Sequence, residues 1–317
     1  MTTVSQQRVD RSFHRRSIGI IGISAAVACV LQCQRSGPTI ATTPVQAADA
    51  RLVSRVTPQA PPRIATMALD ANAAAGARQS SESLEDLART DPVGFAEYCL
   101  QQCRQNIRDY KCTFIKHEQI NHTLLDPQTV EVRFRARPFS VDMQFVKNVR
   151  SCSRALYVAG KWRDSDNQDL AWAKPGGAIL RALVPRIKQP IHGPRAYKES
   201  RRTIDQFGFE NTLELIVKYA RIAESEGVLD LRYKGHGEID GRPTYVFERR
   251  LPYTGEDKPY PDRILVYHID QQYLVPTACY SYADDNSTDL LGSYVYRDVQ
   301  FNVGYQDDDF DPDLIDF

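Results

Sequence analysis

The side chains that most often carry chemistry are scattered along this sequence. Five of the six histidines lie outside the N-terminal segment and show neither H-x-x-x-H nor E-x-x-H spacing: His117, His122, His192, His236 and His268. The sequence also contains no G-x-S-x-G nucleophile turn and no glycine-rich phosphate loop. It therefore predicts no catalytic residue, no metal site, no nucleotide site and no cofactor, and the expected protein is not an enzyme.

Two cysteines stand at a spacing that could bind a metal. Cys99 and Cys103 lie four residues apart in a predicted helix, but no second pair has the spacing of a zinc site. Outside the N-terminal segment five cysteines remain, with Cys112, Cys152 and Cys279, so at least one is unpaired within the monomer. Two interpretations stay open: small buried hydrophobic residues throughout, or the same with one bridge such as Cys103–Cys112.

Charged clusters offer further candidates. The tail Asp307–Phe317 is rich in aspartate, but it lacks the glycine and the final glutamate of a calcium-binding EF-hand loop. Three apolar residues in and beside it should hold the tail against the protein body: Phe310, Leu314 and Phe317. Arg249-Arg250 reads as a surface pair, and Arg201-Arg202 reads either as a surface pair or as an anion site near an irregular loop.

Charge and composition exclude some classes of partner. The 317 residues carry 40 basic and 40 acidic side chains, so no net field favours nucleic acid. A hydrophobic content of 42% and 16 tyrosines are typical of a folded domain rich in strands.

The N-terminal segment has the pattern of an export signal. Arg15 and Arg16 precede the uncharged apolar run Ile18–Leu31, about 14 residues long and too short for the roughly 20 residues of a membrane span. Cleavage after Ala47, lipidation at Cys29 and retention as an uncleaved anchor are the alternatives, and the last two predict membrane association. We expect a protein of the periplasm or cell envelope, with a signal at 1–47 and a disordered linker at 48–81.

Residues 82–317 are expected to form one α+β domain. Helices are predicted within 81–109, with Asp91 as N-cap before Pro92, and over 209–226, ending at Gly227. The clearest strand pattern is the alternation in Thr129–Val146, which predicts an antiparallel hairpin turning at Arg137-Pro138. Eight further strands are predicted: 110–118, 154–160, 169–173, 229–239, 243–251, 262–269, 275–283 and 291–303.

Three segments resemble a known bacterial family. They are YKCTFIKHE (110–118), FRARPFSVDMQFV (134–146) with the following ALYVAG, and EIDGRPTYVFERR (238–250). Together they resemble the exported family called domain of unknown function 1571, and in fold pattern the LolA/LolB-like lipoprotein carriers. The resemblance implies a strongly curved antiparallel sheet, an incomplete β-barrel, with helices on its concave face. No catalytic residues come with it.

The apolar face of this sheet is the candidate binding surface. Eight residues are predicted to line a hollow between sheet and helices: Val132, Phe134, Phe139, Val141, Met143, Phe145, Tyr245 and Phe247. The resemblance implies that a lipid, or the acyl chain of a lipoprotein, occupies such a hollow. The alternatives are a core filled by the helices, an envelope assembly protein that binds a partner through its surface, and a hydrolase.

Overall fold

The computed structural model describes residues 82–317 apart from 178–182, 256–258 and 316. The predicted signal and linker, 1–47 and 48–81, lie outside the described residues. Within the part of the chain that is described, no helix combines the length and the apolar character needed to cross a membrane.

Helices and strands alternate in blocks along the chain. Residues 82–90 are helical. The other helical elements are α2 (Pro92–Asn106), α4 (Pro194–Glu199), η1 (Ile204–Gln206), α5 (Phe209–Ser225) and η2 (Asp307–Phe310). The strands are β1 (Asp109–Ile120), β2 (Thr123–Leu124), β3 (Gln128–Arg135), β4 (Ser140–Lys147), β5 (Cys152–Val158), β6 (Leu170–Pro175), β7 (Ile187–Pro190), β8 (Asp230–Ile239), β9 (Arg242–Arg250), β10 (Ile264–Asp270), β11 (Pro276–Tyr282) and β12 (Leu290–Phe301).

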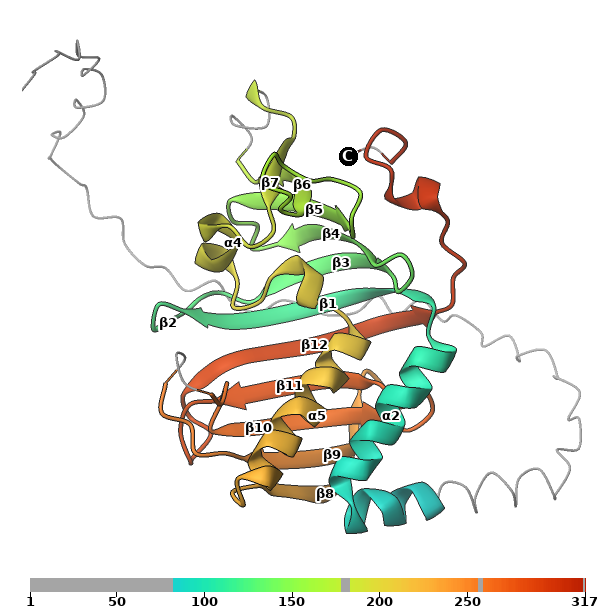
Figure 1. The fold of residues 1–317 in the computed structure, drawn as a ribbon, viewed down its shortest axis with the longest axis vertical. Coiled ribbons are helices and arrows are strands. Elements are labelled where there is room, and N and C mark those ends of the chain that lie inside the picture. The colour runs from blue at the N-terminus through green and yellow to red at the C-terminus, as the bar shows by residue number, and fades with distance from the viewer. Residues whose placement is uncertain (1–81, 178–182, 256–258, 316) are drawn as a thin grey trace, which may run out of the picture. The chain divides into compact units, whose positions relative to one another are not determined.

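The strands form one open antiparallel sheet (Figure 1). Its order is β7-β6-β5-β4-β3-β1-β12-β11-β10-β9-β8, with β2 paired to β1 only. Two meanders, β3–β7 and β8–β12, therefore meet where β1 pairs with both β3 and β12. The predicted α+β fold, an unclosed antiparallel sheet with helices on one face, is confirmed.

The strand order forces the chain to cross a face of the sheet. The chain leaves the sheet at one edge, β7, and re-enters it at the other edge, β8. Ten strand spacings separate these edges, about 48 Å at roughly 4.8 Å per spacing. The 17-residue helix α5 spans about 25 Å of that path, so the segment before it, 191–208, must cover the rest.

Helices α2 and α5 pack on each other and cover the β8–β12 part of the sheet (Figure 1). Asp91 caps α2, because its carboxylate accepts a hydrogen bond from the Gly94 amide at 2.9 Å, and Pro92 occupies the first turn. Both features agree with the sequence-based prediction. The face of α2 that carries Phe95 and Cys99 is buried, and the predicted apolar stripe of α5 is buried as well.

The predicted hairpin is formed by β3 and β4, and its register places Val132 opposite Met143 and Phe134 opposite Val141. The two long helices do not form the main cover of this hairpin. Phe95 of α2 instead packs on Tyr245 and Phe247 of β9, with ring centroids 5.4 and 5.2 Å apart. The cover of the hairpin comes mainly from 191–208, because α2 and α5 lie toward the β8 edge (Figure 1).

The C-terminal tail packs against β4 and β5. Phe310 is fully buried with Leu156 and Val158, and Phe317 packs against the same cluster. Leu314 is 65% exposed, so the expectation that it helps to hold the tail is wrong. The aspartates instead pair with basic side chains, as in the 2.8 Å contact between Asp307 and Arg135.

Gly208, which precedes α5, has a backbone conformation that favours glycine. Its φ of 111° and ψ of 164° fall in a region that other residues avoid. A Cβ atom there would also lie 3.1 Å from the Phe134 ring. We therefore expect Gly208→Ala to lower the free energy of unfolding by about 3 kcal/mol in urea denaturation, because backbone strain and crowding add.

Gly227→Ala is the matched control for this prediction. Gly227 also has a positive φ, 70°, but no atom lies within 4 Å of its Cβ position. It should lose only the backbone contribution, about 1 kcal/mol. Equal losses for the two variants would contradict the close packing of the chain against Phe134.

Candidate functional site

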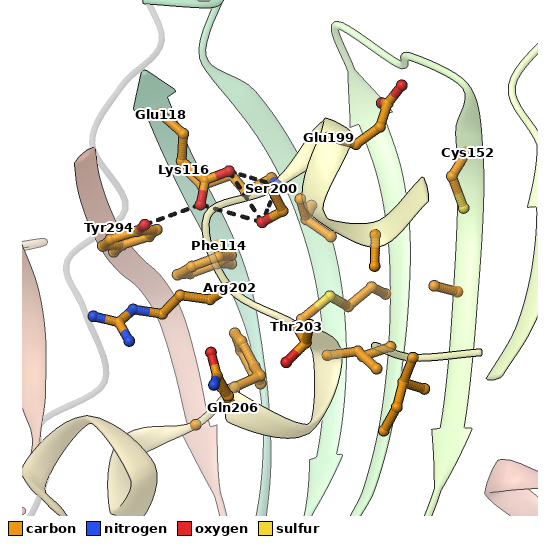
Figure 2. Close-up of a pocket in the computed structure, with 18 of the residues that line it drawn as sticks. Phe114, Lys116, Glu118, Cys152, Glu199, Ser200, Arg202, Thr203, Gln206 and Tyr294 are labelled. Atoms are coloured by element: carbon orange, nitrogen blue, oxygen red, sulfur yellow. Dashed lines mark hydrogen bonds and ion pairs between the residues drawn. The ribbon is translucent and has the colours of Figure 1, made fainter. Parts of the chain in front are cut away.

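A cavity of about 540 Å³ lies between the sheet and the segment that crosses it (Figure 2). Its floor is one face of the sheet, and its roof is formed by 191–208 with the start of α5. The floor residues include Phe114, Val130, Met143, Phe145, Ala155, Ala171, Ala173, Ile187, Leu265, Cys279, Tyr294 and Tyr296, and the roof residues include Ile191, Ser200, Arg202, Thr203, Ile204, Phe207, Gly208, Thr212 and Ile216.

The strand register explains why residues so far apart in sequence share this floor. Directly paired residues lie on the same face of an antiparallel sheet. One row runs Tyr296, Phe114, Val130, Phe145 through β12, β1, β3 and β4. A second row runs Met143, Ala155, Ala173, Ile187 through β4, β5, β6 and β7.

Small side chains leave the space open at the β5–β6 end. Ala155, Ala171 and Ala173 all line the cavity, whereas Trp172, whose side chain points to the opposite face, does not. The roof above them consists of the single turn-and-a-half of α4 and of irregular chain. A layer of this kind carries fewer side chains than two packed helices, so the floor is not filled from above.

The lining also contains a buried carboxylate, Glu118, that joins three parts of the fold. Glu118 of β1 is 1% exposed and accepts hydrogen bonds from Lys116 at 3.0 Å and from the Tyr294 hydroxyl of β12 at 2.9 Å. The Ser200 hydroxyl, at the end of α4, lies 3.1 and 3.2 Å from its two oxygens. Figure 2 shows these contacts as dashed lines converging on one carboxylate.

The electrostatics of this cluster favour a charged Glu118. Burial raises the pKa of its carboxyl, but the Lys116 ammonium and the donors Tyr294 and Ser200 outweigh burial, so the pKa lies below its usual value. Burial raises the pKa of Tyr294 strongly, and Glu118 raises it further, so this hydroxyl stays protonated as a donor. The cluster therefore ties the roof at Ser200 to β1 and β12.

The same contacts argue against a serine nucleophile. Lys116 lies 3.1 Å from the Ser200 hydroxyl, a distance at which a neutral lysine could act as base. Lys116 instead donates a hydrogen bond to the Glu118 carboxylate at 3.0 Å. The arrangement is suited to positioning the roof, and the carboxylate that accepts from the hydroxyl, Glu118, is a weak base because its pKa is lowered.

The eight residues predicted to line a hollow fall into three groups. Met143 and Phe145 line the cavity. Val132, Phe134 and Val141 are buried in the main core, where Phe134 stacks on Tyr110 with ring centroids 4.7 Å apart, and Phe139 packs edge-on against Phe134. Tyr245 and Phe247 lie under α2 and do not reach the cavity.

The sequence-based prediction of the lining does not include several residues that line the cavity. Phe114, Lys116 and Glu118 continue one face of β1 at intervals of two, and two charged residues on an inward face are a signal that could have been used. The segment 191–208, which supplies the roof residues, shows no periodicity. Only the length and irregularity of the loop that contains it indicate a functional role.

The cysteines do not form a metal site or a bridge in the described structure. Cys99, Cys103, Cys112, Cys152 and Cys279 all carry free thiols, and the Cys103–Cys112 bridge is not formed. Within the described residues, no group of three His, Cys, Asp or Glu side chains could hold a metal ion. Burial raises the pKa of Cys103 to about 12 and that of Cys279 to about 12, so these thiols stay protonated.

A family model described as "Protein of unknown function (DUF1571)" matches residues 107–316. Because the match covers more than half of the chain, the chain belongs to this family, and the sequence-based assignment is confirmed. Among curated proteins, no sequence matches the chain significantly.

The chain is also similar to solved structures at low identity. One is the Pseudomonas aeruginosa MucA/MucB complex, with 13% identity, a TM-score of 0.41, and coverage of 70% of this chain and 61% of that chain. Mycobacterium tuberculosis lipoprotein LppX has 13% identity and a TM-score of 0.29, with coverage of 68% of this chain and 99% of that chain. A LolA superfamily protein from Nitrosomonas europaea has 10% identity and a TM-score of 0.26, with coverage of 69% of this chain and 99% of that chain. At these values the similarity concerns the fold and says nothing of what this chain binds.

The Glu118 cluster predicts a specific dependence of stability on pH. Because the pKa of Glu118 is lowered in the folded protein, its contribution is complete above about pH 4.5 and is lost as pH falls through the folded-state pKa. Glu118→Gln should lower the free energy of unfolding at pH 7 by about 3 kcal/mol, since it leaves Lys116 without its carboxylate. Urea denaturation between pH 3 and 7 measures both effects.

Glu131→Gln, on the exposed side of the neighbouring strand β3, is the control. It should stay within about 0.5 kcal/mol of the unchanged protein at pH 7. If the free energy of unfolding of Glu118→Gln fell between pH 4.5 and 3 by as much as that of the unchanged protein, the assigned role of Glu118 would be wrong.

Proposed function

We propose that this member of the DUF1571 family is a non-enzymatic binding protein that holds an acyl chain, from a lipid or an acylated protein, in the cavity between sheet and roof. The observation that carries the proposal is the cavity of about 540 Å³, whose floor is built mainly from apolar side chains. Ligand sites of proteins typically measure about 300–1,000 Å³ and combine apolar walls with a few polar groups.

The cavity is much larger than the voids of an ordinary core. Packed interiors leave few spaces larger than a water molecule. Here the floor carries Phe114, Phe145 and Met143, flexible or flat side chains that adapt to an elongated apolar partner. Burying about 200 Å² of an acyl chain would contribute about 5 kcal/mol, enough for useful affinity.

Exposed lining residues indicate where a ligand enters. Ser151, in the turn between β4 and β5, and Lys198 of α4 are exposed and also line the cavity. They lie beside Cys152 and Glu199, which reach the interior. An acyl chain would enter between α4 and this turn and lie along the floor toward Met143.

The proposed setting is the periplasm or cell envelope. Its support is the basic residues Arg15 and Arg16 followed by the uncharged run Ile18–Leu31. A carrier of acyl chains is useful in that compartment, because such chains cannot cross an aqueous layer without cover.

The first test is native mass spectrometry of the full chain, gently extracted from the cells that make it. We expect an added mass of a few hundred daltons, released as a lipid under denaturing conditions. Repeated spectra with the mass of the protein alone, in a preparation that retains lipids on a known carrier, would contradict the proposal.

The second test fills the cavity. Ala155→Phe adds an aromatic side chain to the floor, where Ala155 lines the cavity and is only partly buried. It should weaken binding of the uncharged fluorescent probe N-phenyl-1-naphthylamine at least tenfold, because ring and probe compete for one space. Val146→Phe, at a 47% exposed position of β4 outside the cavity, should leave probe binding within about twofold. Equal effects of the two variants would place the probe elsewhere.

A further inference from the structure

The β11–β12 side of the cavity contains an arginine that pairs with no carboxylate among the described residues. Arg202 belongs to the roof and is partly buried, and its guanidinium lies on the same side of the cavity as Tyr294 (Figure 2). Among the described residues, it makes no hydrogen bond or ion pair with any protein group. The nearby Lys116 differs, because Glu118 neutralises it at 3.0 Å.

A second arginine, Arg249 of β9, lies in the wall on the same side. Its side chain is 1% exposed, and one nitrogen pairs with Asp262 at 3.1 Å. Its Nε and Nη1 atoms are buried and have no acceptor within the described structure. A guanidinium presents five N–H groups, and buried donors of this kind are normally satisfied. Protein atoms enclose both nitrogens, so they do not open onto the cavity, and Arg249 contributes positive charge to its wall.

The two guanidinium groups act on one part of the floor. Arg249 is paired with Leu265, and Leu265 with Ser281, so the row leads across β9, β10 and β11. Cys279 lies two residues from Ser281 on the same face. Burial raises the pKa of the Cys279 thiol to about 12; Arg202 and Arg249 act to lower it, and Asp262 acts to raise it. Both positive groups are thus close enough to Cys279 to influence it.

Among the described residues of this wall, the charge balance is positive. Arg202 and Arg249 contribute two positive charges, and Asp262 contributes one negative charge. An oxyanion with a single negative charge would balance them. Arginine is well suited to it, because its planar fork can donate two parallel hydrogen bonds to a carboxylate or phosphate.

We propose that the cavity binds an anionic amphiphile, whose carboxylate or phosphate head pairs with Arg202 beside the positive charge of Arg249. Its chain then lies over Phe114, Phe145 and Met143 toward Ile187 of β7. This assignment rests on the proposed function, since it specifies the head group and orientation of a ligand for the same cavity.

The experiment compares three ligands that share a 16-carbon chain and differ in head group, with butyrate as a short-chain carboxylate. Displacement of N-phenyl-1-naphthylamine from the full chain at pH 8 measures the affinity for palmitate, 1-palmitoyl lysophosphatidate, hexadecanol and butyrate. At least one of the two long-chain anions should bind about tenfold or more tightly than hexadecanol, as a charge-assisted hydrogen bond predicts. The tighter anion identifies the head group.

Variants identify the residue responsible. Arg202→Gln should weaken binding of the preferred anion about tenfold and change hexadecanol by less than twofold. Arg202→Lys, which keeps the charge but loses the planar fork, should give an intermediate loss. Arg108→Gln, at an exposed arginine between α2 and β1 that does not line the cavity, is the control and should change neither ligand more than about twofold.

The outcomes separate this proposal from the one on which it rests. If neither the naphthylamine nor any long-chain ligand binds, the proposed function itself fails. If hexadecanol binds as tightly as both anions, or Arg202→Gln leaves the anion affinity unchanged, the cavity binds apolar chains and the anionic head is wrong. If butyrate competes as well as palmitate, the chain contributes nothing and the amphiphile is overturned.

Discussion

The structure depends on one topological constraint: the chain leaves its sheet at β7 and re-enters it at the opposite edge, at β8. Residues 191–229 must therefore cross a face of the sheet. An amphipathic helix, α5, covers the β8–β12 side, and irregular chain with the short α4 covers the other. This division determines how the space between the sheet and the crossing segment is packed.

The two sides of the sheet are packed differently as a result. Under α2, toward the β8 edge, α2 and α5 pack on each other, and aromatic side chains such as Phe95 and Phe247 fill the space between helix and sheet. On the β1–β7 side, one thin layer faces a floor with alanines at 155, 171 and 173. The buried Glu118 holds this layer in place through Ser200. A cavity remains because the roof is held firmly without filling the space below it.

Much of the fold could be predicted from local sequence patterns. The hairpin Thr129–Val146, the cap at Asp91 and the stripe of α5 all follow from side-chain periodicity or short-range hydrogen bonding. The candidate site could be predicted only in part, with Met143 and Phe145 on its floor. Tyr245 and Phe247 have the same alternation as Met143, and only the long-range placement of α2 decides that they are covered. Arg202 lies in a segment without periodicity, and its position depends on the whole sheet.

The most direct test of the central claim is a crystal structure of the full chain with a fatty acid that carries bromine at the end of its chain. Anomalous scattering then locates one atom of the ligand without reliance on the shape of weak density. If the acyl chain lies in the cavity, a bromine peak is expected inside it, near Met143 and Ile187, with the roof residues 191–208 closed above it. A bromine peak only on the outer surface, or a cavity filled by the protein's own side chains, would contradict it.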